Sequence, residues 1–226
     1  MVEIGAGKGA LTEFLLQRAA RVIAIEVDPV LVHYLRQTFR EAVETGHLHV
    51  IEGDVLKTDL AAFGERPVIA GNLPYYITSP ILEKVFSLAG NWSRAVFLVQ
   101  AEVATRITAE PSNRDFGYLS VLVQVHSEAD KVLDVPRDAF RPPPKVESAV
   151  IALVPHAPGQ FQIADLPRFL KFAQTCFRQK RKTLRNNLSP TYGDAIDQMP
   201  EAKRRAEQLS VAELVALHRK LELARQ

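Results

Sequence analysis

The sequence predicts an α/β fold with a parallel, doubly wound sheet, followed by a smaller helical domain. Short apolar runs alternate with amphipathic helical stretches through residues 1–100, which is typical of consecutive βαβ units. From Leu166 onward the pattern is helical, and Leu214, Leu217 and Leu221 mark a final amphipathic helix. The chain is therefore expected to combine a sheet domain with an all-α domain.

Five parallel strands and three long helices account for the first part of the chain. The strands are expected near 2–4, 22–26, 48–52, 67–71 and 94–100, and the helices near 10–20, 29–44 and 79–89. Two later apolar runs, Tyr118–Val125 and Ser148–Val154, have no long helix between them. We expect these two runs to form an antiparallel hairpin at the edge of the sheet.

Composition agrees with a soluble enzyme of one main domain and a smaller one. The chain has 226 residues, of which 47% are hydrophobic, and no run approaches the roughly 18 apolar residues of a membrane span. The single cysteine, Cys176, excludes an internal disulfide and fits a reducing compartment. No group of His and Cys has metal-ligand spacing, so we expect a cytoplasmic protein without a metal.

Charge is divided unevenly between the two expected domains, 1–158 and 159–226. Residues 1–154 hold 15 Lys and Arg against 19 Asp and Glu, whereas residues 163–226 hold 13 against 7. A dense basic cluster in the second domain is suited to phosphate contact, although a solvated helix face is the alternative. This basic cluster consists of Arg178, Lys180, Arg181, Lys182 and Arg185.

A glycine turn follows the first strand. Val2-Glu3-Ile4 runs directly into Gly5-Ala6-Gly7-Lys8-Gly9, and an amphipathic helix follows. Glycines at such a turn allow the backbone to approach a ligand closely. The spacing is G-x-G-x-G, which differs from the G-x-G-x-x-G of dinucleotide-binding proteins.

Acids stand at the ends of the next two strands. Glu26 is placed where a ribose diol can hydrogen-bond to its carboxylate. After the third strand, Asp54 can accept a hydrogen bond from an adenine amino group, and Val55 can pack on the ring. Ligands of parallel sheets bind outside the carboxyl ends of the strands, so these residues are expected to form one site with the glycine turn.

The fourth strand leads into Asn72-Leu73-Pro74-Tyr75-Tyr76. The Asn72 side-chain carbonyl can accept one hydrogen of a planar amine such as N6 of adenine. Pro74 biases Leu73 away from helical angles, so that the Leu73 carbonyl can accept the other hydrogen. Tyr75 offers a ring face for stacking. This segment predicts a site that holds an exocyclic amine.

Together these segments resemble the rRNA adenine N6-dimethyltransferase family. The segment 140–148, Phe-Arg-Pro-Pro-Pro-Lys-Val-Glu-Ser, resembles the family's proline-rich segment, and 176–188 resembles the C-terminal domain of its bacterial small-subunit branch. The resemblance implies a Rossmann-like class I methyltransferase sheet that binds S-adenosylmethionine. The residues it implies for cofactor binding are Glu3, Gly5, Ala6, Gly7, Gly9, Glu26, Val27, Gly53, Asp54, Val55 and Asn72.

The resemblance also implies the substrate and the roles of residues around it. Asn72, Leu73, Pro74 and Tyr75 are expected to be catalytic, and Tyr75 and Phe140 to stack on the target base. The substrate implied is two adjacent adenines in the 3′-terminal hairpin loop of small-subunit rRNA, each dimethylated within a pre-30S particle. The basic cluster is then expected to bind RNA, and the protein to act as a monomer without membrane contact.

The chain departs from the family pattern at its N-terminus. Family members usually carry a few dozen residues before the first strand, including a basic stretch with an Asn-Phe-Leu signature, whereas this sequence begins inside that strand. We expect these 226 residues to bind the cofactor more weakly and to turn over little, compared with an N-terminally extended chain. A side-by-side methylation assay tests this expectation.

Three other interpretations remain open. A large-subunit rRNA dimethyltransferase of the antibiotic-resistance type shares the catalytic motifs, although the segment 180–188 argues against it. A non-catalytic RNA-binding assembly factor on the same fold is a second interpretation. A nicotinamide oxidoreductase is the third, and the glycine spacing argues against it.

Overall fold

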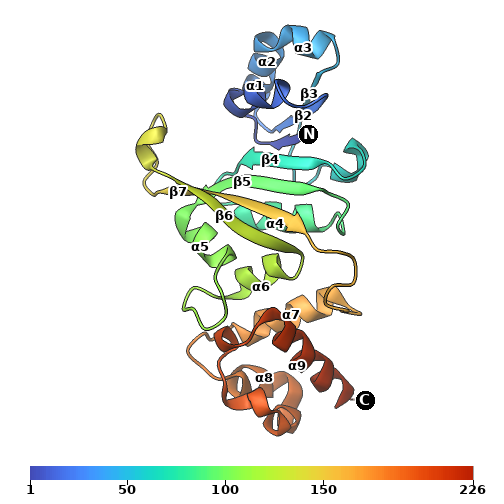
Figure 1. Ribbon diagram of the computed structural model, residues 1–226, viewed down its shortest axis with the longest axis vertical. Coiled ribbons are helices and arrows are strands. Elements are labelled where there is room, and N and C mark those ends of the chain that lie inside the picture. The colour runs from blue at the N-terminus through green and yellow to red at the C-terminus, as the bar shows by residue number, and fades with distance from the viewer. Residues whose placement is uncertain (226) are drawn as a thin grey trace. The chain divides into compact units, whose positions relative to one another are not determined.

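The computed structural model describes residues 1–225, and its first part is a seven-stranded twisted sheet (Figure 1). The strand order is β3-β2-β1-β4-β5-β7-β6. The five expected parallel strands are confirmed, because β1 to β5 pair in parallel in this order. Their bounds are Val2–Ile4 for β1, Val22–Glu26 for β2, Leu48–Glu52 for β3, Val68–Asn72 for β4 and Arg94–Gln100 for β5.

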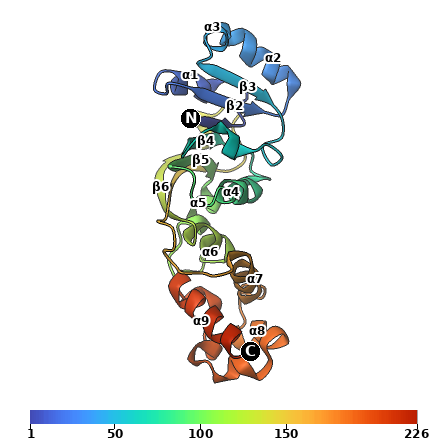
Figure 2. The ribbon, with the colours of Figure 1, turned by 90° about the vertical axis from the view of Figure 1, so that its right-hand side faces the viewer.

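Three helices gather around β2 and β3 in Figure 2. They are α1 (Ala10–Leu16), α2 (Pro29–Thr38) and α3 (Arg40–Glu44). Asp28 caps α2 by accepting the Val30 N–H at 2.8 Å, and Pro29 occupies the first turn, where its missing N–H costs nothing. The expected helix 29–44 is divided at Phe39, whose backbone leaves helical angles at φ −109° and ψ 36°.

One face of the sheet is buried beneath these helices. Side chains alternate between the two faces of each strand, so that one set of residues points to the helices. Val22, Ala24, Leu48 and Ala70 of this set form a single cluster with Ala6 of the glycine turn and with Leu15 and Leu35 of the helices, and Phe39 packs against it. Burial of this cluster fixes the register of β2 against β3 and therefore the relative position of their carboxyl ends.

The expected strand at Tyr118–Val125 is wrong, because these residues form the helix α6 (Tyr118–Gln124). Its start is capped by Ser120, whose hydroxyl accepts the Gly117 N–H and donates to the Arg106 carbonyl. The Gln124 amide holds the other end by donating to two carbonyls of the preceding segment. A short apolar run occurs in strands and in buried helices alike, so the sequence pattern does not distinguish them. The side-chain hydrogen bonds of Ser120 and Gln124 stabilise the helix here.

The antiparallel edge of the sheet is formed by other residues. The residues expected to form the second strand of the hairpin do form a strand, β7 (Ser148–Pro155), which pairs antiparallel with β5. The outermost strand is β6 (Ser127–Val135). β6 is mostly exposed and carries the Lys131–Asp134 ion pair, and charges of this kind protect sheet edges from pairing. The loop between β6 and β7, yellow in Figure 1, extends beyond the end of the sheet.

The chain forms two compact units. Unit 1 comprises Met1–Ala104 and Glu128–Pro155, with the sheet and the helix α4 (Thr78–Phe86), while unit 2 comprises Thr105–Ser127 and the chain from His156 onward. The expected boundary at residue 158 lies close to the last of the three passages between the units, after Pro155, but it assigns residues 105–127 to the sheet domain. The structure groups them with the helical unit, whose last residue, Gln226, lies outside the described residues.

Unit 2 is helical, as predicted, with α7 (Leu166–Cys176), α8 (Leu184–Tyr192) and α9 (Val211–Leu223). The helix α5 (Ala101–Ile107) leads into it from β5. Leu214, Leu217 and Leu221 are buried in its core beside Phe169 and Cys176, as the helical spacing predicted. None of the helices in residues 1–225 combines the length and the apolar character that a membrane span requires.

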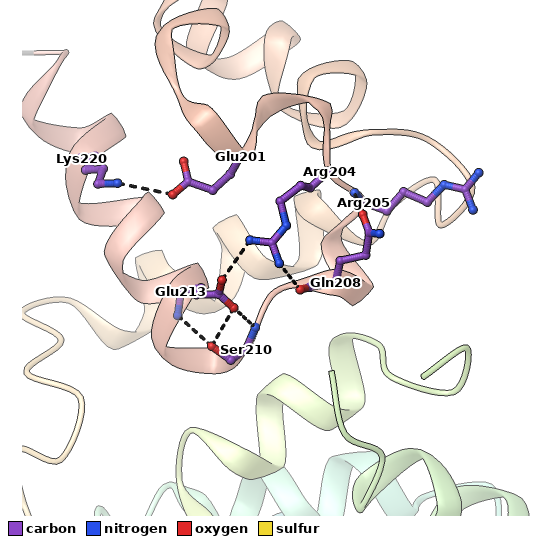
Figure 3. A network of polar contacts seen from close by, with 7 residues as sticks. All are labelled: Glu201, Arg204, Arg205, Gln208, Ser210, Glu213 and Lys220. Carbon is purple, nitrogen blue, oxygen red and sulfur yellow. Dashed lines mark hydrogen bonds and ion pairs between the residues drawn. The ribbon is translucent and has the colours of Figure 1, made fainter. Parts of the chain in front are cut away.

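A polar network joins the start of α9 to the segment before it (Figure 3). Ser210 and Glu213 form a capping box at the start of α9, and Arg204 donates to the Glu213 carboxylate at 2.9 Å. The Arg204 carbonyl accepts the Leu184 N–H at 2.8 Å, which holds the first turn of α8. Arg204 therefore connects the start of α9 to the start of α8, which follows the basic residues 178–182 in the chain.

Candidate active site

The carboxyl ends of four neighbouring strands carry most of the predicted site residues. In the order β3, β2, β1, β4 these ends lead to Asp54, Glu26, the glycine turn and Asn72. The chain reverses its direction of strand addition between β1 and β4, which is the topological switch point where ligands of such sheets bind. The structure therefore brings these residues to one edge, as the sequence predicted.

The glycine turn adopts a backbone that other residues rarely reach. Gly5, Gly7 and Gly9 have φ angles of 71°, 59° and 84°. A Cβ on Gly9 would lie 2.4 Å from the Phe39 ring, so only glycine fits there. A Cβ on Gly7 would meet nothing within 4 Å, so the space over the turn is open to a ligand. Ala6, which stands between Gly5 and Gly7 in the chain, is buried.

Glu26 is tied to the glycine turn. Its carboxylate accepts the Gly7 N–H at 2.8 Å, the Val27 N–H at 2.9 Å and the Asp28 N–H at 3.0 Å. A carboxylate offers about four acceptor positions, so one remains for a hydroxyl donor. Val27, the next residue, has 66% of its surface exposed, which leaves an apolar side chain available beside this carboxylate.

Asp54 and its neighbours form the turn after β3. Gly53 donates its N–H to the Glu26 carbonyl at 2.9 Å, which ties this turn to the end of β2. Asp54 accepts the Leu56 N–H at 2.9 Å through one carboxylate oxygen. Val55 is 7% exposed, so it lies mainly in the core. A second oxygen of Asp54 is therefore the group of this turn best suited to accept from a ligand.

Glu3 lies beneath the glycine turn. It is 1% exposed, and its carboxyl accepts the Thr12 hydroxyl at 2.6 Å. Burial raises the pKa of Glu3 to about 7, with a smaller contribution from the negative charge of Glu26. Its carboxyl thus bonds to the first turn of α1, and its role in cofactor binding stays a prediction.

A separate cavity of about 260 Å³ is lined by Asn72, Leu73, Pro74, Tyr75, Phe140, Pro142 and Pro144. All four predicted catalytic residues and the second predicted stacking ring therefore share it. The cavity adjoins the glycine turn, because a Cβ on Gly5 would lie 3.8 Å from the Asn72 backbone oxygen. Leu73 is buried and donates its N–H to the Leu98 carbonyl at 3.1 Å, which anchors this segment to β5.

The basic cluster lies in unit 2, in the segment between α7 and α8 and on the first turn of α8. All five of its side chains are exposed. Arg185 bonds to the Asp197 carboxylate at 2.7 Å, and the Lys180 ammonium donates to the Arg114 carbonyl. Arg178, Arg181 and Lys182 are accordingly the members best placed for phosphate contact.

Two residues escaped the sequence interpretation although they contact predicted site residues. Ser148 bonds to the Tyr75 hydroxyl at 2.8 Å, and Thr12 donates to Glu3. A third, Glu147, accepts the Arg137 N–H in the loop that carries Phe140. Ser148 and Glu147 belong to the proline-rich segment 140–148, and this segment was the feature of the sequence from which they could have been found. Within residues 1–225, no group of three His, Cys, Asp or Glu side chains is arranged to hold a metal.

The fold and the site together define a class I methyltransferase. Two solved structures share its architecture over nearly the whole chain. The dimethyladenosine transferase from Plasmodium falciparum matches with a TM-score of 0.80 at 27% identity, over 99% of this chain and 88% of that one. The 23S rRNA methyltransferase ErmE matches with a TM-score of 0.71 at 26% identity, over 98% and 90%.

Sequence comparison gives the family. The model of the ribosomal RNA adenine dimethylase family matches residues 1–222. A ribosomal RNA small subunit methyltransferase A from Acidobacterium capsulatum is 45% identical, over 98% of this chain and 81% of the relative. One from Xanthomonas euvesicatoria pv. vesicatoria is 43% identical, over 96% and 83%. The chain belongs to the ribosomal RNA adenine dimethylase family, and the resemblance found in the sequence is confirmed.

Proposed function

We propose that this protein dimethylates N6 of two adjacent adenines in the 3′-terminal hairpin loop of small-subunit rRNA, using S-adenosylmethionine as methyl donor. The observation that carries this proposal is the cavity shared by Asn72, Leu73, Tyr75 and Phe140, next to the glycine turn. The protein is an enzyme of the rRNA adenine dimethylase family. The particular bases and the pre-30S particle are part of the proposal.

The residues at the strand ends fit S-adenosylmethionine. Open space over Gly7 leaves room for its amino-acid part, and the remaining acceptor of Glu26 suits a ribose hydroxyl. Asp54 can accept from the adenine amino group of the cofactor. When bound, S-adenosylmethionine supplies a methyl group on a positively charged sulfur. Val27 offers an apolar contact for its adenine ring.

The residues of the cavity are suited to hold the target amine. The Asn72 side-chain carbonyl and the Leu73 carbonyl accept the two N6 hydrogens, while Tyr75 and Phe140 flank the base. As N6 gains positive charge during transfer, both hydrogen bonds strengthen, so the transition state is favoured over the bound substrate. Loop adenines suit this arrangement, because an unpaired base leaves its stack at low cost.

The small-subunit substrate is favoured over the large-subunit one. The relatives with 43–45% identity are named small-subunit methyltransferases, whereas the large-subunit enzyme ErmE is 26% identical. We therefore propose rRNA in a pre-30S particle as the partner of the basic cluster. We also propose action as a monomer, in the cytoplasm and without a metal.

A transfer assay on two substrates tests the proposal. Labelled S-adenosylmethionine is supplied with unmodified 30S particles or with isolated 23S rRNA, and the product nucleosides are identified by mass. We expect dimethyladenosine in the 16S rRNA of the 30S particles. Label in 23S rRNA alone would favour the large-subunit interpretation, and cofactor binding without transfer to either RNA would favour a binding module.

Substitution of Glu26 by alanine is expected to weaken S-adenosylmethionine binding about tenfold, because a charged hydrogen bond to the ribose is worth about 1.5 kcal/mol. Loss of the bond to the Gly7 N–H also frees the glycine turn. Calorimetric titration with the cofactor measures the effect. Glu52 at the end of β3 is the control, since Glu52→Ala removes an exposed carboxylate from the neighbouring strand. Equal affinity for Glu26→Ala and the wild type would contradict the assignment.

Removal of three charges from the basic cluster is expected to lower the affinity for RNA. It should also make this affinity less dependent on the salt concentration. With Arg178, Arg181 and Lys182 replaced by glutamine, the slope of log affinity against log salt should fall by about 2, because each phosphate contact contributes roughly 0.7–0.9. Filter binding of 30S particles between low and high salt measures the slope.

The matched control removes three charges elsewhere in unit 2, at Lys171, Lys203 and Arg219. The control should keep most of the wild-type slope, since its three charges lie outside the basic cluster, although its loss of net charge is identical. Equal slopes for the two triple variants would show that net charge alone, and not this cluster, governs RNA binding.

A further inference from the structure

Both aromatic rings of the cavity are connected to two adjacent residues, Glu147 and Ser148, where the β6–β7 loop ends and β7 begins. The Tyr75 and Ser148 hydroxyls lie 2.8 Å apart, although 73 positions separate them in the chain. Ser148 is fully buried and pairs in register with Gln100 at the end of β5. The sheet therefore fixes the position of the hydroxyl to which Tyr75 is bonded.

This hydrogen bond restricts rotation of the Tyr75 side chain about its Cα–Cβ bond. Rotation about the Cα–Cβ bond swings the whole ring and moves its hydroxyl by several ångströms, which would break the contact with Ser148. At its other end the ring is held by the backbone that follows Leu73, which is itself anchored to Leu98 of β5. Tyr75 is thus attached to the sheet at both ends.

Phe140 is held through Glu147. The Glu147 carboxylate accepts the Arg137 N–H at 2.8 Å and lies 3.9 Å from the Arg137 guanidinium, which closes the loop at its base. The Phe140 N–H donates to the Arg137 carbonyl at 3.2 Å, so Phe140 directly follows this closure. The Glu147 carbonyl in turn accepts the Ala101 N–H at 3.0 Å, which attaches the base of the loop to the end of β5.

We propose that Ser148 and Glu147 are positioning residues for the target base, Ser148 through Tyr75 and Glu147 through the loop that carries Phe140. The start of β7 then sets the separation of the two rings between which the base is inserted. This inference rests on the proposed function, because it takes the cavity as the site of the adenine. Neither residue touches the base itself.

The first experiment uses Ser148→Ala, Tyr75→Phe and their combination. Each single variant removes the same hydrogen bond, so each should lower kcat for methylation of 30S particles about fivefold, and the double variant should be no worse than either. The affinity for S-adenosylmethionine should stay within twofold of the wild type. Ser87→Ala is the control. Ser87 is an exposed serine directly after α4, and its hydroxyl donates to the Lys84 carbonyl of that helix.

The second experiment separates binding of the base from transfer. A hairpin RNA carries 2-aminopurine at the target adenine, and its fluorescence is quenched when the base stacks on an aromatic ring. Ser148→Ala should weaken this quenching about as much as Tyr75→Phe does. Glu147→Ala should weaken it as well, whereas Glu147→Gln should restore it, because the amide oxygen can still accept the Arg137 N–H.

The outcomes distinguish this inference from the proposed function. If the double variant lost kcat by the product of the two single losses, the positioning role would be overturned. Quenching in Ser148→Ala equal to that of the wild type would overturn it as well. A lower unfolding midpoint in Ser148→Ala with unchanged kcat and quenching would likewise show a structural role alone. If the wild type quenches the probe but transfers no methyl group, the proposed function fails, and the quenching of the variants still decides whether Ser148 and Glu147 position the base.

Discussion

Replacing Asn72 with alanine is expected to lower the rate of methyl transfer at least 100-fold, while the affinity for S-adenosylmethionine stays within about twofold of the wild type. Asn72 is the exposed last residue of β4 and lines the cavity with Tyr75. Its side-chain oxygen accepts a hydrogen of N6 more strongly as charge develops there, and loss of one such group typically costs 10²–10³ in rate. Single-turnover transfer to 30S particles measures the loss without interference from product release.

Two further variants define what Asn72 contributes. Asn72→Asp keeps an oxygen acceptor at this position and should therefore retain more transfer than Asn72→Ala. Asn91→Ala is the control, because Asn91 is an exposed asparagine of unit 1 whose side chain accepts the Arg66 N–H outside the cavity. If Asn72→Ala weakened cofactor binding by the same factor as transfer, the side chain would act on the cofactor and not on the amine.

The common placement of Glu26, Asp54 and Asn72 could be predicted because it depends on features local to the chain. Each lies at or just after the end of a short strand, and parallel strands with helical connections end at the same edge of a sheet. The structure adds the strand order and register, which bring the four strand ends together. The chemical roles of these residues remain predictions.

Contacts between residues distant in sequence could not be predicted from such local features. The bond between Tyr75 and Ser148 depends on the pairing of β5 with β7, which no local pattern determines. The helix α6 was mistaken for a strand because five of its seven residues are apolar and three of them are β-branched or aromatic. Its helical state depends on bonds from Ser120 and Gln124 to segments before it. The same helix accounts for the different division of the chain into units, since its buried face belongs to the core of unit 2.

Glutamine in place of Glu3 is expected to stabilise unit 1 by about 2.5 kcal/mol more at pH 8 than at pH 5. Glu3 is buried, and its pKa is raised to about 7 from an ordinary value of 4.5. The folded protein therefore keeps this proton at pH values where the unfolded chain has lost it. Its contribution to stability is present in full below about pH 4.5 and declines by about 1.4 kcal/mol per pH unit until about pH 7. Glutamine cannot ionise, so the variant lacks this decline.

Urea unfolding at pH 5 and pH 8 measures the difference between the two proteins, and the single tryptophan makes the measurement specific. Trp92 is buried in unit 1, so its fluorescence reports the unfolding of the sheet unit alone. The control is Glu83→Gln on the exposed face of α4, which should change stability by less than about 0.5 kcal/mol at either pH. A difference between Glu3→Gln and the wild type that is the same at both pH values would mean that Glu3 ionises in its ordinary range. Burial beneath the glycine turn would then be compensated by its bond to Thr12, and the proton would have no part in the stability of this turn.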